Sequence, residues 1–193
     1  MKIEFCVTSV EGAIAAEQFK ADRIELCSRL DLDGLTPSLN LIQQCRSKYK
    51  GEIHIMIRPV DGPFICNDSL LNKMQNSIVK SAEIGINGVV FGVLNDNNEI
   101  NKRATASLVK IAKRYHLETT FHRAFDHLTD PIASVKQLHN LGVNRILCSG
   151  SNTNVEKGIQ SLKKLKITAQ NDIEIMAGGG VNQYNAPLLQ QIG

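Results

Sequence analysis

The chain has 193 residues, of which 42% are hydrophobic and 21% charged, so it can bury one sizeable core like an ordinary soluble globular domain. Its formal net charge of +3 is too small to predict a nucleic-acid partner. No apolar stretch approaches the roughly 20 residues of a membrane span, so no membrane partner is expected. Five cysteines without a CxxC pair, behind an N-terminus unlike a signal peptide, predict reduced thiols in the cytoplasm.

Short runs rich in isoleucine and valine alternate with longer stretches of helical period. The predicted strands cover residues 2–7, 23–27, 52–59, 88–92, 117–122, 145–149 and 173–177. The predicted helices between them include 37–49, 70–84, 104–115, 131–141 and 154–165. Pro37 after Thr36 and Pro131 after Asp130 fit the first helical position after an N-cap. The glycines at positions 85 and 142 fit the end of a helix.

Strands that alternate with helices predict an α/β fold with a parallel sheet, either doubly wound or closed into a barrel. No GxGxxG follows the first strand, which disfavours a nucleotide-binding doubly wound fold. The strands alternate in polarity: isoleucines at 53, 55 and 57 alternate with His54, Met56 and Arg58. One apolar and one polar face are typical of a TIM-type (β/α) barrel. We expect residues 1–193 to form a single barrel domain that lacks its C-terminal end, because residues 185–193 begin a helix that no eighth strand follows.

The alternation predicts one set of residues that face the barrel lumen. Its members are Glu4, Cys6, Glu25, Cys27, His54, Met56, Arg58, Glu118, Thr120 and His122. Buried charges need partners, so these residues form either a self-satisfied polar network or a site for a ligand. Active sites of such barrels lie at the carboxyl ends of the strands.

The residues at those ends can do acid–base chemistry on an anion. Glu25, His122 and Asp126 are the candidate catalytic groups, and Arg58 and Arg123 are the candidate clamp for a carboxylate or phosphate.

A second group of inward residues offers sulfur. Cys6, Cys27 and Met56, with Cys148 as a further candidate, carry thiol and thioether donors that suit Cu(I). Cysteine and methionine are also common core residues, and no closely spaced ligand motif supports a metal site. Both interpretations stay open.

Gly178, Gly179 and Gly180 follow the last predicted strand. Their backbone N–H groups can approach a bound phosphate, as the last loops of such barrels often do. A tight turn that needs positive φ explains the same glycines equally well.

Several short motifs resemble the CutC copper-homeostasis family, in order along the whole chain. They are Glu25-Leu26-Cys27, Gly34-Leu35-Thr36-Pro37-Ser38, Met56-Ile57-Arg58-Pro59, Gly88-Val89-Val90-Phe91-Gly92-Val93-Leu94, Phe121-His122-Arg123-Ala124-Phe125-Asp126, Arg145-Ile146-Leu147 with Ser149-Gly150, and Gly178-Gly179-Gly180. The resemblance implies a cytosolic TIM-type barrel associated with copper handling, and it brings no settled reaction. It also implies that the five candidate residues at the barrel mouth belong to the site, with Cys27 as the metal-facing thiol.

Two functions follow from these observations. The first is a copper-homeostasis protein that binds a copper ion, Cu(I), as its cofactor or cargo. The alternative is a barrel enzyme that acts on a small anionic metabolite; a barrel that only binds its ligand is a third. A barrel with exposed apolar ends can form a homodimer, although the sequence locates no interface.

Overall fold

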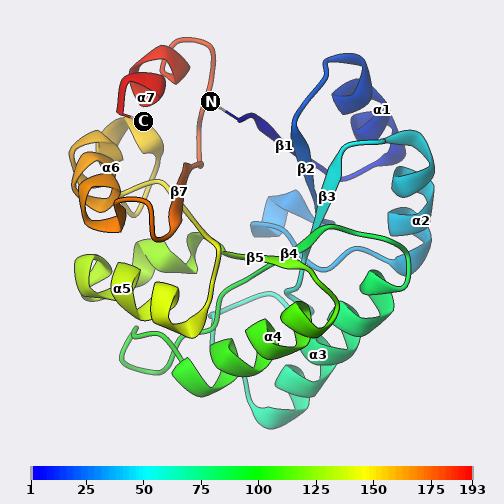
Figure 1. Ribbon diagram of the computed structural model, residues 1–193, viewed down its shortest axis with the longest axis horizontal. Coiled ribbons are helices and arrows are strands. Elements are labelled where there is room, and N and C mark those ends of the chain that lie inside the picture. Colours follow the sequence, from blue (N-terminus) through cyan, green and yellow to red (C-terminus); the bar gives the residue numbers. More distant parts are fainter. Residues whose placement is uncertain (1, 193) are drawn as a thin grey trace. The chain divides into compact units, whose positions relative to one another are not determined.

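The computed structural model describes residues 2–192, in which seven parallel strands alternate with helices (Figure 1). The strands are β1 (Glu4–Val7), β2 (Arg23–Leu26), β3 (Glu52–Met56), β4 (Gly88–Phe91), β5 (Glu118–Phe121), β6 (Arg145–Cys148) and β7 (Glu174–Ala177). The helices are α1 (Val10–Gln18), α2 (Leu39–Lys48), α3 (Asp68–Ala82), α4 (Lys102–Arg114), α5 (Pro131–Leu141), α6 (Val155–Ala169) and α7 (Ala186–Ile192), with 3-10 turns η1 (Leu30–Leu32) and η2 (Arg123–His127). Among residues 2–192, no helix has both the length and the apolarity that a bilayer crossing needs.

The strands follow one another in the sheet in chain order, from β1 to β7. This order, with a helix after each strand, is that of a TIM-type (β/α) barrel, and the described residues carry seven of its eight strands. The predicted fold class is therefore confirmed. The strands are shorter than predicted: β3 ends at Met56, because the next residues leave the sheet and the N–H of Arg58 donates to Thr36 Oγ1 (2.8 Å).

Side-chain caps start most of the helices. The side-chain oxygens of Ser9, Ser38, Asn67, Asp130 and Asn154 each accept a hydrogen bond from an N–H in the first turn of α1, α2, α3, α5 and α6. The prediction for α5 is confirmed, with Pro131 directly after its cap.

A helix forms where α2 was predicted, but its predicted start after a Thr36 cap is wrong. This helix begins at Leu39 and is capped by Ser38, because the hydroxyl of Thr36 is held by the end of β3 instead. The glycines at 85 and 142 both adopt φ of +83°, as predicted for residues that end a helix.

The described chain divides into two compact units. The amino-terminal unit comprises Lys2–Phe91 and Lys110–Thr119, and so holds β1 to β4 and the first residues of β5. The carboxy-terminal unit comprises Gly92–Val109 and the residues from Thr120 onward. That the whole chain forms one barrel domain stays a prediction.

Each unit separates an apolar from a polar face of its strands. In the amino-terminal unit, Ile24, Leu26, Ile53 and Ile55 are fully buried on the face that the helices cover, and Figure 1 shows α1 and α2 on one side of β2 and β3. The residues between them in sequence occupy the opposite face, which we call the inner face. Parallel pairing aligns Cys6 of β1 with Glu25 of β2, and Glu25 with His54 of β3.

In the carboxy-terminal unit the inner face carries a polar cluster. Arg145 of β6 donates to Thr120 Oγ1 (3.1 Å) and pairs with Glu174 of β7 (2.8 Å). Alternation from Arg145 puts Cys148 on the helix-covered face, so the suggestion that Cys148 faces inward is wrong.

Candidate functional site

Three sulfur atoms gather on the inner face of the amino-terminal unit. Cys6 lies near the end of β1, Cys27 directly follows β2, and Met56 ends β3. The thiols of Cys6 and Cys27 are 3.7 Å apart. Cys27 and Met56 are both buried, in one cluster with Val90. The structure thus brings together the three residues that the sequence proposed as sulfur ligands.

The sulfur cluster, which we define as Cys6, Cys27 and Met56, packs against a glycine. Gly34 lies in the loop after β2 with a φ of +86°, in the left-handed region that favours glycine. A Cβ atom there would lie 3.3 Å from Met56 Cε and 3.4 Å from Cys27 Sγ. The Met56 side chain and the Cys27 thiol therefore meet against the same point of this loop.

The Cys6 thiol holds its proton more strongly than an ordinary thiol. The hydrogen bond to Cys27 and, next, burial raise the pKa of the Cys6 thiol well above its ordinary value of 9.0. Thiolates rather than thiols are metal ligands, so an ion that binds here must displace protons. Cys6 is exposed as a residue, which gives an ion access to the pair from solvent.

Glu25 lies deeper on the same face than the sequence indicated. Its residue is 5% exposed and stands between Cys6 and His54 in the sheet register. Burial and, next, the negative charge of Glu4 raise the pKa of the Glu25 carboxyl well above 4.5. The carboxyl therefore holds its proton more strongly than an ordinary glutamate does, and its catalytic role stays a prediction.

The Arg58 guanidinium binds the surrounding loops and does not form an open site for an anion. Its guanidinium donates to the carbonyls of Leu32, Gly34 and Gly62 and pairs with Asp61 (3.1 Å). Its Cζ also lies 5.1 Å from the centre of the Phe64 ring. These contacts use most of the guanidinium donors, and they fix the loop that carries Gly34 beside the sulfur cluster.

In the carboxy-terminal unit, the side chains of His122 and Asp126 accept hydrogen bonds from backbone N–H groups. His122 Nδ1 accepts a hydrogen bond from Ala124 N–H (3.1 Å) and so caps η2. The buried Asp126 carboxylate accepts bonds from the N–H groups of Ser149 and Gly150 and pairs with Arg123 (3.1 Å). Both side chains therefore hold the backbone in place. Either one would have to break these hydrogen bonds before it could act as a general acid or base.

The glycine turn after β7 lies against Arg123. Gly179 and Gly180 have φ of +88° and +96°, which supports the interpretation as a turn that requires glycine. A Cβ at Gly179 would come 2.9 Å from Arg123 Cζ, so the guanidinium packs directly on this turn. The structure brings Arg123, Gly178, Gly179 and Gly180 to one place, and their role in substrate binding stays a prediction.

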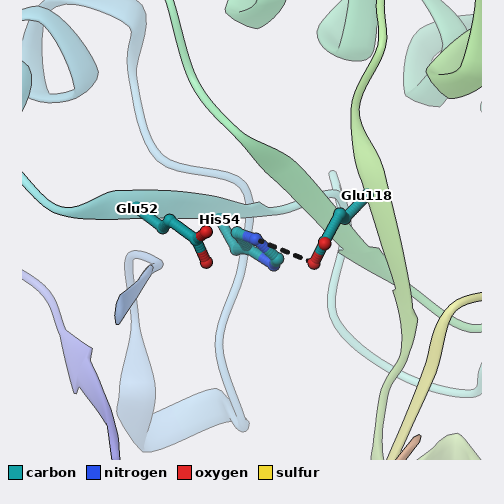
Figure 2. A group of neighbouring side chains, drawn as sticks. All are labelled: Glu52, His54 and Glu118. Carbon is teal, nitrogen blue, oxygen red and sulfur yellow. Dashed lines mark ion pairs between the residues drawn. The ribbon is translucent and has the colours of Figure 1, made fainter. Parts of the chain in front are cut away.

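Several charged residues at the amino ends of the strands were not predicted from the sequence. Arg23 and Glu52 open β2 and β3, and Arg23 is ion-paired with Glu4. Arg145 and Glu174 open β6 and β7. Extending the same alternation one step back from Glu25 and His54 would have placed Arg23 and Glu52 on the inner face. Figure 2 shows three neighbouring side chains from this region, Glu52, His54 and Glu118.

The fold and the sulfur cluster define a TIM-type barrel protein with soft metal donors on the inner face of its strands. The model of the CutC family matches residues 1–193, and the chain belongs to this family. A CutC family protein from Glaesserella parasuis serovar 5 (strain SH0165) is 44% identical over 185 residues, which is 96% of this chain and 75% of the relative. The human copper homeostasis protein cutC homolog is 39% identical over 183 residues, 95% of this chain and 66% of that protein.

Solved structures agree with this assignment. A CutC structure from Streptococcus agalactiae superposes with a TM-score of 0.91 at 33% identity, and the match covers 100% of this chain and 94% of that one. A 3-hexulose-6-phosphate synthase superposes with a TM-score of 0.68 at 15% identity, over 100% of this chain and 86% of that one. The second likeness shows the barrel fold alone.

Proposed function

We propose that this chain takes part in copper homeostasis by binding one Cu(I) ion in the cytoplasm, through Cys6, Cys27 and Met56. The observation that carries the proposal is the approach of the two thiols to 3.7 Å, with the Met56 thioether beside Cys27. Two sulfurs that each lie about 2.3 Å from one ion can be as much as about 4.6 Å apart, so this spacing fits a shared ion. Soft thiolate and thioether ligands suit Cu(I).

The state of the five cysteines supports a location in the cytoplasm. None forms a disulfide in the structure, and all five are free thiols. Reduced thiols are typical of the cytoplasm, where Cu(I) is also the stable form in the presence of cellular thiols. The name of the human relative supports a part in copper homeostasis.

The alternative, an enzyme acting on an anionic metabolite, has less support. Arg58, His122 and Asp126 are engaged by backbone groups and loops in the described residues, and burial raises the pKa of the Glu25 carboxyl. A catalytic group must instead be able to reach substrate. The sulfur cluster needs no such rearrangement.

The proposal is tested by an anaerobic competition titration of the reduced chain with a chromophoric Cu(I) chelator. The wild type is expected to take one Cu(I) per chain, and Cys27→Ser is expected to lose it because serine offers no soft donor. Cys45→Ser is the matched control, since Cys45 is a buried thiol of α2 whose sulfur lies near Ser9 O (3.7 Å) and outside the cluster. Met56→Leu, which keeps the volume and removes the sulfur, is expected to weaken binding without abolishing it.

Equal Cu(I) affinity of wild type and Cys27→Ser would overturn the proposal. Circular dichroism of each variant establishes that it is folded. If Cys27→Ser does not fold, Cys6→Ser provides the same test at an exposed position.

A further inference from the structure

Three ionisable side chains converge at the amino ends of β3 and β5, away from the sulfur cluster. Glu52 and His54 belong to β3 and Glu118 opens β5. One ligand atom from each of the three lies within 4.8 Å of the others, and His54 Nε2 is 3.8 Å from Glu118 Oε2. Figure 2 shows the imidazole between the two carboxylates, with the His54–Glu118 pair marked.

The imidazole reaches Glu118 because β4, the intervening strand, has no side chain at that point. The residue that pairs with His54 in β4 is Gly88. A Cβ atom on Gly88 would lie 2.5 Å from His54 Cε1 and 2.6 Å from its Nε2, a distance that no pair of such atoms tolerates. Glycine at 88 therefore lets His54 lie across β4 toward β5, and the fully buried ring is held in that position.

The charges around the imidazole favour a cation. The guanidinium of Arg23 is ion-paired with Glu4 and lies 3.8 Å from Glu52 Oε2, so a single arginine serves two carboxylates. Negative charge from Glu52 and Glu118 is therefore in excess, and a bound cation would balance it.

We propose that Glu52, His54 and Glu118 form a site for a divalent cation of the Zn²⁺ class. One imidazole nitrogen and two carboxylate oxygens are borderline and hard donors, which suit Zn²⁺ and Mn²⁺ and do not suit Cu(I). Ligands about 2.0–2.2 Å from a tetrahedral Zn²⁺ lie about 3.3–3.6 Å apart, so the three groups close by about 1 Å when the ion binds. The two carboxylates can make this movement, since the side chains of Glu52 and Glu118 are 46% and 48% exposed.

An ion would reach this site from solvent through the two half-exposed carboxylates, and it would have a structural role there. Glu52 also lines an open pocket of about 460 Å³ at this end of the strands. Barrel enzymes place their chemistry at the carboxyl ends of the strands, whereas residues at the amino ends serve stability. An ion here would link β3 to β5 across Gly88 of β4 and so stabilise the amino-terminal unit.

The test uses the full chain, stripped of metal by a chelator, and titrated with Co²⁺ as a coloured substitute for Zn²⁺. We expect one Co²⁺ per chain with visible d–d absorption and no sulfur-to-cobalt charge-transfer band, and we expect Zn²⁺ to displace it. Glu118→Gln is expected to weaken binding by about tenfold or more, since even changes outside the ligand shell reach 10–100-fold. Glu174→Gln is the matched control: it opens β7 as Glu118 opens β5, its side chain is 45% exposed, and it pairs with Arg145 instead.

Absence of one-to-one Co²⁺ binding by the wild type, or equal affinity of Glu118→Gln, would overturn the proposal. A sulfur-to-cobalt band that Cys27→Ser removes would do the same, because it would assign the ion to the sulfur cluster. The inference does not rest on the proposed function: Cys27→Ser is expected to lose Cu(I) and keep Co²⁺, while Glu118→Gln is expected to do the reverse. Should Glu118→Gln fail to fold, Glu52→Gln on the other side of the imidazole replaces it.

Discussion

The two ends of the inner face in the amino-terminal unit carry opposite kinds of donor. At the amino ends of the strands lie oxygen and nitrogen donors, in Glu4, Glu52, His54 and Glu118. At the carboxyl ends of the first three strands lie the sulfur atoms of the cluster, with the two thiols in contact. The strands are only four or five residues long, so two to four sequence positions separate the hard end (oxygen and nitrogen donors) from the soft end (sulfur donors).

Two simple rules account for this difference between the ends. Alternation decides which side chains share the inner face, and position along the strand decides which metal they suit. Glu4 and Cys6 of β1 differ by one step of the alternation, as do His54 and Met56 of β3. This difference between the ends would be contradicted if residues at either end could be replaced without a change in stability or ion binding. It would also be contradicted if both ends bound the same ion.

The largest effect is expected from breaking the ion pair at the hard end. Glu4→Gln removes the negative charge that pairs with the Arg23 guanidinium, whose side chain is 2% exposed. Removing one member of a buried pair costs about 3–5 kcal/mol, so we expect a loss of that order in the free energy of unfolding measured in urea.

Asp31→Asn is its control, because it removes an ion pair of the same type, Arg29–Asp31, on the surface. Surface pairs contribute little, so no measurable change is expected there. A Glu4→Gln variant as stable as Asp31→Asn would mean that the amino ends of the strands are not organised by charge.

A smaller loss is expected from closing the gap in β4. Gly88→Ala places a methyl group where the His54 ring lies, and overpacking of this kind costs about 1–3 kcal/mol. Thermal or urea unfolding measures the loss. The same substitution in a His54→Ala background is expected to cost clearly less, because the ring that it meets is gone. Equal costs in the two backgrounds would contradict the role given to Gly88.

The smallest effect is a change in pH dependence at Glu25, which lies between the two ends. The folded protein keeps a proton on Glu25 that the unfolded chain releases above its ordinary pKa of about 4.5, because burial raises the folded pKa. Wild-type stability therefore decreases as the pH rises above that value, and the decrease ends once the folded pKa is passed.

Glu25→Gln removes this titration. Its stability relative to the wild type is expected to increase with pH from about 5 upward, as followed by urea unfolding at several pH values. Parallel profiles of the two proteins would show that the Glu25 carboxyl is already ionised near its ordinary pKa.

Much of the fold followed from the sequence because its signals are local. The alternation of Ile53 and Ile55 with His54 and Met56 is visible in the sequence and predicts which of them share a face of β3, although all four are buried in the structure. The cap of α2 was misplaced because Thr36 and Ser38 are both good caps, and only the bond from Arg58 N–H, from a distant segment, decides between them.

The candidate site was predicted only in part for the same reason. Alternation placed Cys6, Cys27 and Met56 on one face, but the contact between the two thiols depends on the register of β1 and β2. The approach of Glu118 to His54 depends on pairing with β4 and on the glycine there, which no local pattern reveals. Likewise, the loop contacts that engage Arg58 come from residues remote in sequence.

The separation of soft and hard donors can be measured directly by X-ray absorption spectroscopy of one chain loaded with one equivalent of Cu(I) and one of Zn²⁺. We predict a sulfur-only first shell at the copper edge and a nitrogen and oxygen shell at the zinc edge, with neither ion displacing the other. Nitrogen or oxygen ligands on copper, or sulfur ligands on zinc, would contradict the assignment of the two kinds of donor to opposite ends of the strands.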